Sequence, residues 1–291
     1  MQKNISIIYA VLAAALYAVN APFSKMLLTY VEPTMMASFL YLGAGVGLFL
    51  YSFFEKVMGK KVHRELLTKR ELPYTIAMVV LDIIAPILLM FGIKFSSASN
   101  ASLLNNFEIV ATSLIALIIF KELISKKLWI AIILVTIASI ILSFEGMRDF
   151  ELNYGSLFVL GACCCWGFEN NCTKMISNKS PVEIVVIKGT FSGLGSLIVA
   201  YTIGEKFPAF YWILATFLLG FVAYGLSIYF YIMAQKELGA AKTSAYYSIA
   251  PFLGVIFGMV ILGEAPGVRF YFALIIMLAG TYFMVKDTVK S

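Results

Sequence analysis

Apolar runs follow one another along almost the whole chain, separated by short polar segments. Ten runs can be drawn, over residues 5–29, 34–54, 73–93, 99–119, 128–145, 155–176, 183–203, 211–233, 242–262 and 269–286. A helix needs about 20 consecutive, mostly apolar residues to cross a hydrocarbon core of ~30 Å. We therefore predict an all-α membrane protein with ten transmembrane helices.

Two parts of this pattern repeat. Residues 100–122 align without a gap on residues 242–264, so that Glu122 falls on Glu264 at the end of each apolar run. A second match, between the segments YAVNAPFSKM and WGFENNCTKM, occurs earlier in each half at nearly the same shift. Two matches in the same order indicate that the chain consists of two versions of one five-helix unit.

The two units are expected at residues 1–149 and 150–291 and together form one domain, for which the topology below indicates transport. Because each unit has an odd number of helices, the second must enter the membrane from the opposite side. This 5+5 inverted-topology repeat is typical of secondary transporters, which hold the substrate near mid-membrane between the repeats.

Basic residues give the orientation. With the N-terminus inside, most lysines and arginines fall in the inner segments, whereas the outer ends hold Lys25, Lys94, Arg148, Lys206 and Arg269. Cytoplasmic loops of membrane proteins carry an excess of Lys and Arg. We therefore expect both termini in the cytoplasm.

Composition supports the membrane interpretation and excludes several functions. The chain is 61% hydrophobic and 13% charged, against about 25% charged residues in soluble domains. Its net charge of +6 follows from the basic inner segments. The sequence shows no basic face with base-reading or stacking residues, so we do not expect it to bind nucleic acid. The four cysteines lie in one predicted helix without zinc-site spacing, and the single histidine is His63 in a charged loop. We therefore expect no metal and no cofactor.

Motifs in both halves carry a resemblance to a known family. They are Cys165-Trp166-Gly167 with Asn170, Asn171 and Lys174; Leu238-Gly239-Ala240-Ala241, Ala250-Pro251 and Leu262-Gly263-Glu264; and, in the first half, Ser96-Ser97-Ala98-Ser99-Asn100-Ala101 and Phe120-Lys121-Glu122. Over nearly its whole length the chain resembles the EamA-type permeases of the drug/metabolite transporter superfamily.

The resemblance implies a ten-helix permease without an ATPase domain, often an exporter, in the plasma membrane of a prokaryotic cell. Substrates of such permeases include amino acids, amines, nucleosides and other metabolites, and some relatives form homodimers. The expected partners are thus a small-molecule substrate, the lipid bilayer and a second copy of the chain. One departure is Glu108-Ile109, where the second half has Ala250-Pro251.

The fourth run carries a polar stripe. Asn105, Glu108 and Thr112 stand three and four residues apart, which places them on one helix face. A carboxylate inside a membrane is costly and faces a cavity or another helix rather than lipid. Asn105 and Glu108 are therefore candidates for binding a substrate, and Glu108 also for binding a proton. The alternative is a hydrogen-bonded cluster that holds the helices together.

Charged residues in two other runs extend the set. Asp82 lies one turn before Pro86 and either pairs with a lysine or takes part in substrate and proton binding. Lys188 lies near the start of its run. It either extends to the inner interface or serves as counter-charge for Glu108, Asp82 or Glu169.

Equivalent positions in the first and sixth runs give further candidates. Trp166, Glu169 and Asn170 lie together in the sixth run, and the repeat places Asn20 on Glu169 with Tyr17 one turn earlier. All five are candidates for lining the cavity and binding substrate, and Glu169 is a second proton-coupling candidate beside Glu108.

Tyrosines in the eighth and ninth runs add an aromatic element to the predicted cavity. Tyr224, Tyr246 and Tyr247 are binding candidates, and Tyr231 lies two turns after Tyr224. A tyrosine that faces a cavity can bind an amphipathic or cationic ligand. The alternative for each is packing alone.

Together these features predict a cavity lined by the first, third, fourth, sixth, eighth and ninth runs that opens alternately to each side. Two alternatives stay open, a non-transporting receptor or scaffold and a facilitator of nucleoside or other metabolite diffusion. The chain lacks the His-rich or paired-Asp motifs of intramembrane enzymes. It also has no G-x-x-x-x-G-K-[ST] loop for ATP.

Overall fold

The computed structural model describes residues 2–58, 65–119, 125–145, 151–238, 243 and 246–290. Helices in the first half are α1 (Gln2–Ala18), α2 (Asn20–Leu27), α3 (Pro33–Val57), α4 (Leu72–Phe95), α5 (Ala98–Leu104), α6 (Phe107–Ile118) and α7 (Lys126–Ser143). Those in the second half are α8 (Tyr154–Ile176), α9 (Pro181–Thr202), α10 (Phe210–Gly220), the π-helical turn η1 (Phe221–Leu226), α11 (Ser227–Leu238), α13 (Ala250–Leu262) and α14 (Val268–Lys290). A two-residue pairing of β1 (Phe144–Glu145) with β2 (Glu151–Leu152) joins the halves.

Each expected apolar run corresponds to one helix or to consecutive helices. The first run is divided between α1 and α2 at Val19. Pro22 has no N–H and so cannot donate to the carbonyl of Ala18, which explains the break. The fourth run is divided between α5 and α6 at Asn105 and Asn106. The eighth consists of α10, η1 and α11.

Six helical segments among the described residues are long and apolar enough to cross a membrane. They are Ile5–Leu27, Pro33–Val57, Leu72–Phe95, Ala98–Ile118, Pro181–Thr202 and Phe210–Leu238. Trp129–Leu142, Ala250–Leu262 and Val268–Phe283 are shorter apolar helices. α8 is as long as a span, but Glu169, Asn170 and Asn171 in its sequence lower its hydropathy.

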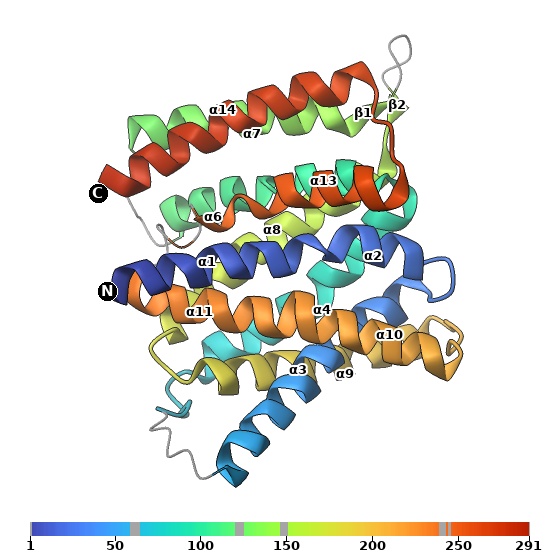
Figure 1. The fold of residues 1–291 in the computed structure, drawn as a ribbon, viewed down its shortest axis with the longest axis vertical. Helices are drawn as coiled ribbons and strands as arrows, with labels where there is room; N and C mark the ends of the chain where they lie inside the picture. The colour runs from blue at the N-terminus through green and yellow to red at the C-terminus, as the bar shows by residue number, and fades with distance from the viewer. Residues whose placement is uncertain are drawn as a thin grey trace.

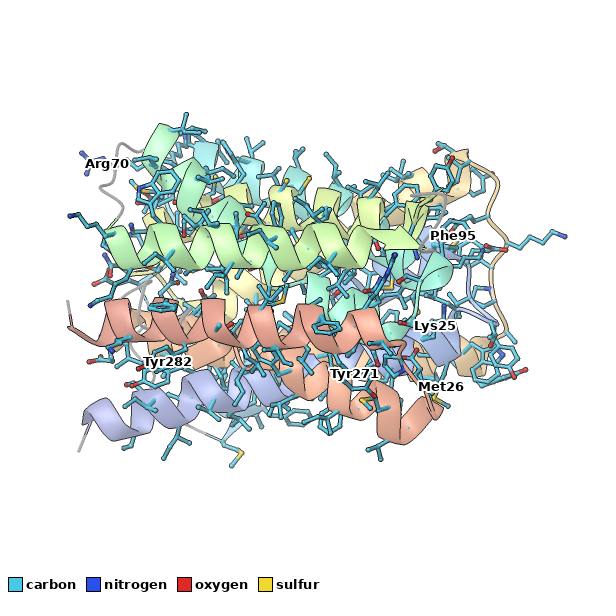
Figure 2. All side chains as sticks on the ribbon, turned by 90° about the horizontal axis from the view of Figure 1, so that it is seen from above. Lys25, Met26, Arg70, Phe95, Tyr271 and Tyr282 are labelled. Carbon is cyan, nitrogen blue, oxygen red and sulfur yellow. The ribbon has the colours of Figure 1, made fainter. Side chains whose placement is uncertain are left out.

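The helices lie side by side with their axes roughly aligned (Figure 1). α7 and α14 pair along one edge of the molecule, and α3 lies at the opposite edge. Both termini lie at one end, which we call the terminal end, and β1–β2 lie at the other, which we call the far end. In Figure 2, Arg70 and Tyr282 lie toward the terminal end, and Lys25 and Phe95 toward the far end.

Glycines bring α3 into close contact with its neighbours. A Cβ atom at Gly189 would lie 2.3 Å from the backbone nitrogen of Gly45, and one at Gly43 would lie 2.2 Å from the carbonyl oxygen of Phe217. Neither position has room for a side chain, so α9 and α10 pack directly on the backbone of α3. These contacts are all within one chain, which leaves none of these glycines free for a homodimer.

Charged side chains hold helix ends together at the far end. The carboxylate of Glu264 accepts hydrogen bonds from the backbone N–H groups of Ala98 (2.7 Å) and Ser99 (2.8 Å) at the start of α5. Lys25 Nζ donates to the carbonyl of Ile93 (2.7 Å) in the last turn of α4. Each charge is matched to a helix end of favourable dipole sign. Glu122, the sequence equivalent of Glu264, lies outside the described residues.

A third such contact ties the second half to the first. Glu205 accepts from the backbone N–H groups of Thr34 (3.0 Å) and Met35 (2.7 Å) in the first turn of α3. Because bonds from ionised groups are stronger than neutral ones, these contacts keep the helices close together at this end.

Candidate functional site

Three charged side chains meet in the interior of the helix bundle. Lys188 Nζ on α9 lies 3.1 Å from Asp82 Oδ2 on α4 and 2.9 Å from Glu169 Oε1 on α8. The exposed fractions are 0% for Asp82, 2% for Glu169 and 5% for Lys188. The lysine is therefore buried between two carboxylates and does not extend to the membrane surface. We call these three residues the ionic triad.

Neighbouring hydroxyl groups complete the hydrogen bonding of the triad. Tyr41 on α3 donates to Asp82 Oδ1 at 2.8 Å. Thr173, one turn after Glu169 on α8, donates to the Glu169 carboxylate. Buried charges are tolerated when they are paired and when their remaining hydrogen-bonding capacity is used. All three members are paired, and each carboxylate also accepts one hydroxyl; Asp82 Oδ2 has the Lys188 ammonium as its ion-pair partner but accepts no hydrogen bond from the described residues.

Glu108 has a different environment from the triad carboxylates. It lies in the first turn of α6, where the helix dipole favours a negative charge. Asn170 Nδ2 on α8 donates to Glu108 Oε1 at 2.6 Å and lies 3.5 Å from Thr112 Oγ1. Among the described residues, no lysine or arginine forms an ion pair with Glu108.

A cavity of about 70 Å³ adjoins both groups. Its lining comes from α1, α3, α6, α8, α9, η1, α11 and the segment before α13: Tyr17, Tyr41, Glu108, Trp166, Glu169, Asn170, Thr173, Lys188, Tyr224, Ser227, Ile228, Tyr231, Ile232 and Tyr247. We call this the central cavity.

The central cavity lies between the middle of the helix bundle and the terminal end. Lys188 is in the second turn of α9, which starts at the terminal end, and Thr173 is in the last turns of α8, which finishes there. Ser227 and Tyr231 lie in the half of the eighth span nearest that end. The contacts of Glu264, Lys25 and Glu205 lie at the opposite end.

Tyrosine rings form a continuous part of the lining. Tyr224 has its ring centroid 5.8 Å from Tyr17 and 5.1 Å from Tyr41. Tyr247 lies 5.9 Å from Tyr17 and 5.1 Å from Tyr231. The five rings therefore lie next to one another in a chain that runs from α3 through η1, α1 and the segment before α13 to α11.

Most of the residues predicted from sequence come together here. Eight of them line the central cavity: Tyr17, Glu108, Trp166, Glu169, Asn170, Lys188, Tyr224 and Tyr247. Four do not line it: Asp82, Asn20, Asn105 and Tyr246.

Three of these four support lining residues from behind. Asp82 holds Lys188, as described above. Asn20 Nδ2 donates to the Tyr224 hydroxyl at 3.3 Å, and Asn105 Nδ2 donates to the Tyr17 hydroxyl at 3.4 Å. They orient the groups that face the cavity rather than facing it themselves.

The expected set of lining helices needs one correction. The third run, α4, contributes no residue to the cavity lining, whereas α3 and α9 do through Tyr41 and Lys188. Tyr41 had no distinguishing signal in a chain with 16 tyrosines. Ser227 could have been found, because Tyr224, Ser227 and Tyr231 stand three and four residues apart on one helix face.

Comparison with known proteins identifies the family. A model of the EamA-like transporter family matches the chain twice, over residues 4–144 and 153–286. The chain belongs to the EamA-like transporter family. The two matched segments fall in the two halves that the sequence repeat defines.

Curated relatives agree with this assignment. The chain is 24% identical to an uncharacterized transporter of Methanothermobacter thermautotrophicus over 98% of its length and 87% of the relative's. It is 21% identical to the uncharacterized transporter YyaM of Bacillus subtilis, over 80% and 78% respectively. One solved structure superposes with a TM-score of 0.69 at 13% identity, covering 97% of this chain and 96% of the other. The protein is thus a multi-pass membrane transporter, as the sequence motifs predicted.

Proposed function

We propose that this EamA-family protein is a secondary transporter, working as an exporter. It moves a small cationic or zwitterionic metabolite, such as an amine or an amino acid, across the plasma membrane by alternating access. The observation that carries the proposal is the central cavity, where Glu108 and the ionic triad meet inside the helix bundle. Buried ionisable groups at membrane depth mark substrate and proton pathways.

Helix packing supports the 5+5 inverted repeat. Interchanging the halves exchanges α3 with α9, α5 with α13 and α7 with α14, and each of these is a pair in contact. In the same exchange α4 corresponds to α11 and α8 corresponds to α1. The contact between α4 and α8 therefore requires a contact between α11 and α1, and these two helices are in contact. Such exchange is what a twofold relation between residues 1–149 and 150–291 requires.

The excess of basic residues in the segments at the terminal end favours a cytoplasmic position for that end. The central cavity then lies on the cytoplasmic side of mid-membrane, beneath a far end closed by Glu264, Lys25 and Glu205. In the opposite state these contacts would break and the terminal end would close. The two states together give alternating access.

Proton coupling follows from the charges around the cavity. Asp82, Glu108 and Glu169 are three carboxylates against the one ammonium of Lys188, so the ionised site has an excess of negative charge. Either a proton or a cationic substrate can neutralise Glu108, and one excludes the other. That competition couples export of substrate to entry of protons, with Glu169 and Asp82 as further proton acceptors when the triad rearranges.

The test is transport in proteoliposomes with an imposed pH gradient. Wild-type protein should move substrate in response to the gradient, and Glu108→Gln should lose that response. Glu237→Gln, an exposed acid at the end of α11, is the matched control and should retain it. Equal pH-driven transport by Glu108→Gln would rule out the proton role. Substrate flux that does not depend on the pH gradient in any of the three proteins would favour a facilitator. Substrate binding without flux would favour a receptor.

A further inference from the structure

The ionic triad restricts which charges the central cavity can accept. Lys188 is the one basic residue among the described residues that line the cavity. Its ammonium group already lies within 3.1 Å of both Asp82 and Glu169. A substrate carboxylate that approached it would compete with two buried carboxylates for the same charge. The cavity therefore offers a substrate anion no free counter-charge.

Glu108, by contrast, offers a counter-charge for a substrate cation. Glu108 is a partly exposed residue that lines the cavity, and its carboxylate has one amide donor, from Asn170. Carboxylate oxygens accept several hydrogen bonds, so Glu108 can bind an ammonium group directly. A monocation placed there would bring the charge of the site closer to balance.

Aromatic and aliphatic side chains make up most of the remaining lining. Tyr17, Trp166, Tyr224, Tyr231 and Tyr247 present rings, and cations bind favourably over the faces of such rings. Ile228 and Ile232 add aliphatic surface. This lining suits a flat or apolar body attached to the charged group.

From these three features we propose that the substrate is an organic monocation, with one protonated or quaternary amine on an aromatic or apolar body and no carboxylate. The inference rests on the proposed function and narrows its substrate class from cationic or zwitterionic metabolites to cations alone. Glu108 binds the charged amine, and the tyrosine rings contact the aromatic or apolar part of the substrate.

A matched series of small molecules separates these contributions. Phenethylamine, phenylalanine and 3-phenylpropionate share one ring and differ in charge, and butylamine keeps the charge without the ring. Thermal unfolding of the purified full-length protein is followed with each compound at neutral pH. Phenethylamine should stabilise the protein at a concentration at least ~10-fold lower than the other three. Equal or stronger stabilisation by phenylalanine or 3-phenylpropionate, or none by phenethylamine, would overturn the inference.

Variants locate the recognition. Glu108→Gln should lose the preference for phenethylamine over phenylalanine, whereas Glu108→Asp, which keeps the charge, and Glu237→Gln should retain it. Tyr247→Phe should bind phenethylamine within about threefold of wild type, and Tyr247→Leu about tenfold more weakly, since it removes the ring. An unchanged preference in Glu108→Gln would contradict the role of that residue.

Flux measurements with the same compounds distinguish the failure of this inference from that of the proposed function. If the protein transports phenylalanine but not phenethylamine, the proposed transport function is retained and the proposed preference for cations is rejected. If phenethylamine stabilises the protein but no compound is transported, the proposed ligand class is retained and the proposed transport function is rejected.

Discussion

The far end and the central cavity use the same charged residue types, lysine and glutamate, in different ways. At the far end, Glu264 accepts from two backbone N–H groups and Lys25 donates to backbone carbonyls. In the central cavity, Lys188 pairs with two side-chain carboxylates, and Glu108 receives one side-chain amide. The far-end charges have fixed helix ends as partners, whereas the cavity charges have side chains as partners, and side chains can be exchanged for other groups.

This difference has a physical basis. A helix terminus presents fixed groups of one sign, so a charge bound there has a permanent partner. Side chains in a cavity can rotate, and a proton or a ligand can replace them. We therefore expect the far-end charges to control which side is open and the cavity charges to control what is bound.

The largest expected effect is on the ionic triad. Lys188→Met leaves Asp82 and Glu169 buried without a counter-charge, which should destabilise the protein by about 3–5 kcal/mol. Lys25→Met, the matched change at the far end, removes a partly exposed ammonium and should cost about 1 kcal/mol. Thermal or denaturant unfolding in detergent compares the two. A smaller loss for Lys188→Met than for Lys25→Met would mean that the triad carries no special cost.

The next effect separates stability from transport. Glu108→Gln keeps a hydrogen-bond acceptor for Asn170, so the free energy of unfolding should change by less than about 1 kcal/mol. Transport of phenethylamine should nevertheless fall by at least tenfold, because the substrate loses its counter-charge. Parallel unfolding and flux measurements decide this. Proportional losses in both would indicate a structural role for Glu108.

A smaller effect is expected at the far end. Glu264→Gln weakens two charge-assisted bonds to the start of α5 and should destabilise the closed end by about 1–2 kcal/mol. Hydrogen–deuterium exchange should increase at residues 98–105. Glu183→Gln is the control, because Glu183 accepts from the Leu67 N–H near the terminal end. The effect of Glu183→Gln should be confined to residues 65–70. If either variant increased exchange at both residues 65–70 and residues 98–105, the contact would not be local.

The smallest effect concerns the hydroxyl that supports the triad. Tyr41→Phe removes the donor to Asp82 while it keeps the ring against Tyr224. The expected loss is about 1 kcal/mol of unfolding free energy, with phenethylamine binding nearly unchanged. Loss of binding without loss of stability would instead make Tyr41 a direct substrate ligand.

Sequence pattern predicted much of the fold. Apolar runs located the helices, because a membrane span needs a minimum apolar length. The division into residues 1–149 and 150–291 stays a prediction, with which the two segments matched by the family model are compatible. The internal breaks were only partly predictable. Pro22 marks the first, but η1 has no proline within Phe221–Leu226, and its Gly225 alone does not predict a π-helical turn.

The candidate site was predictable as a set of residues but not as a set of contacts. Helical spacing put Glu108 and Thr112 on one face, and Asn170 indeed bridges them. The same reasoning left open which acid Lys188 faces, because that choice depends on the relative rotation of α4, α8 and α9. Tertiary packing also sets Asp82 behind the lysine, so α4 supports the cavity without lining it.

Proton release on substrate binding tests the central claim most directly, which is that Glu108 exchanges a proton for the substrate cation. Purified protein in weakly buffered solution near neutral pH is mixed with phenethylamine, and the pH change is recorded. Wild-type protein should release protons on binding, and Glu108→Gln should release none beyond the buffer control. Equal release from both proteins would contradict the account.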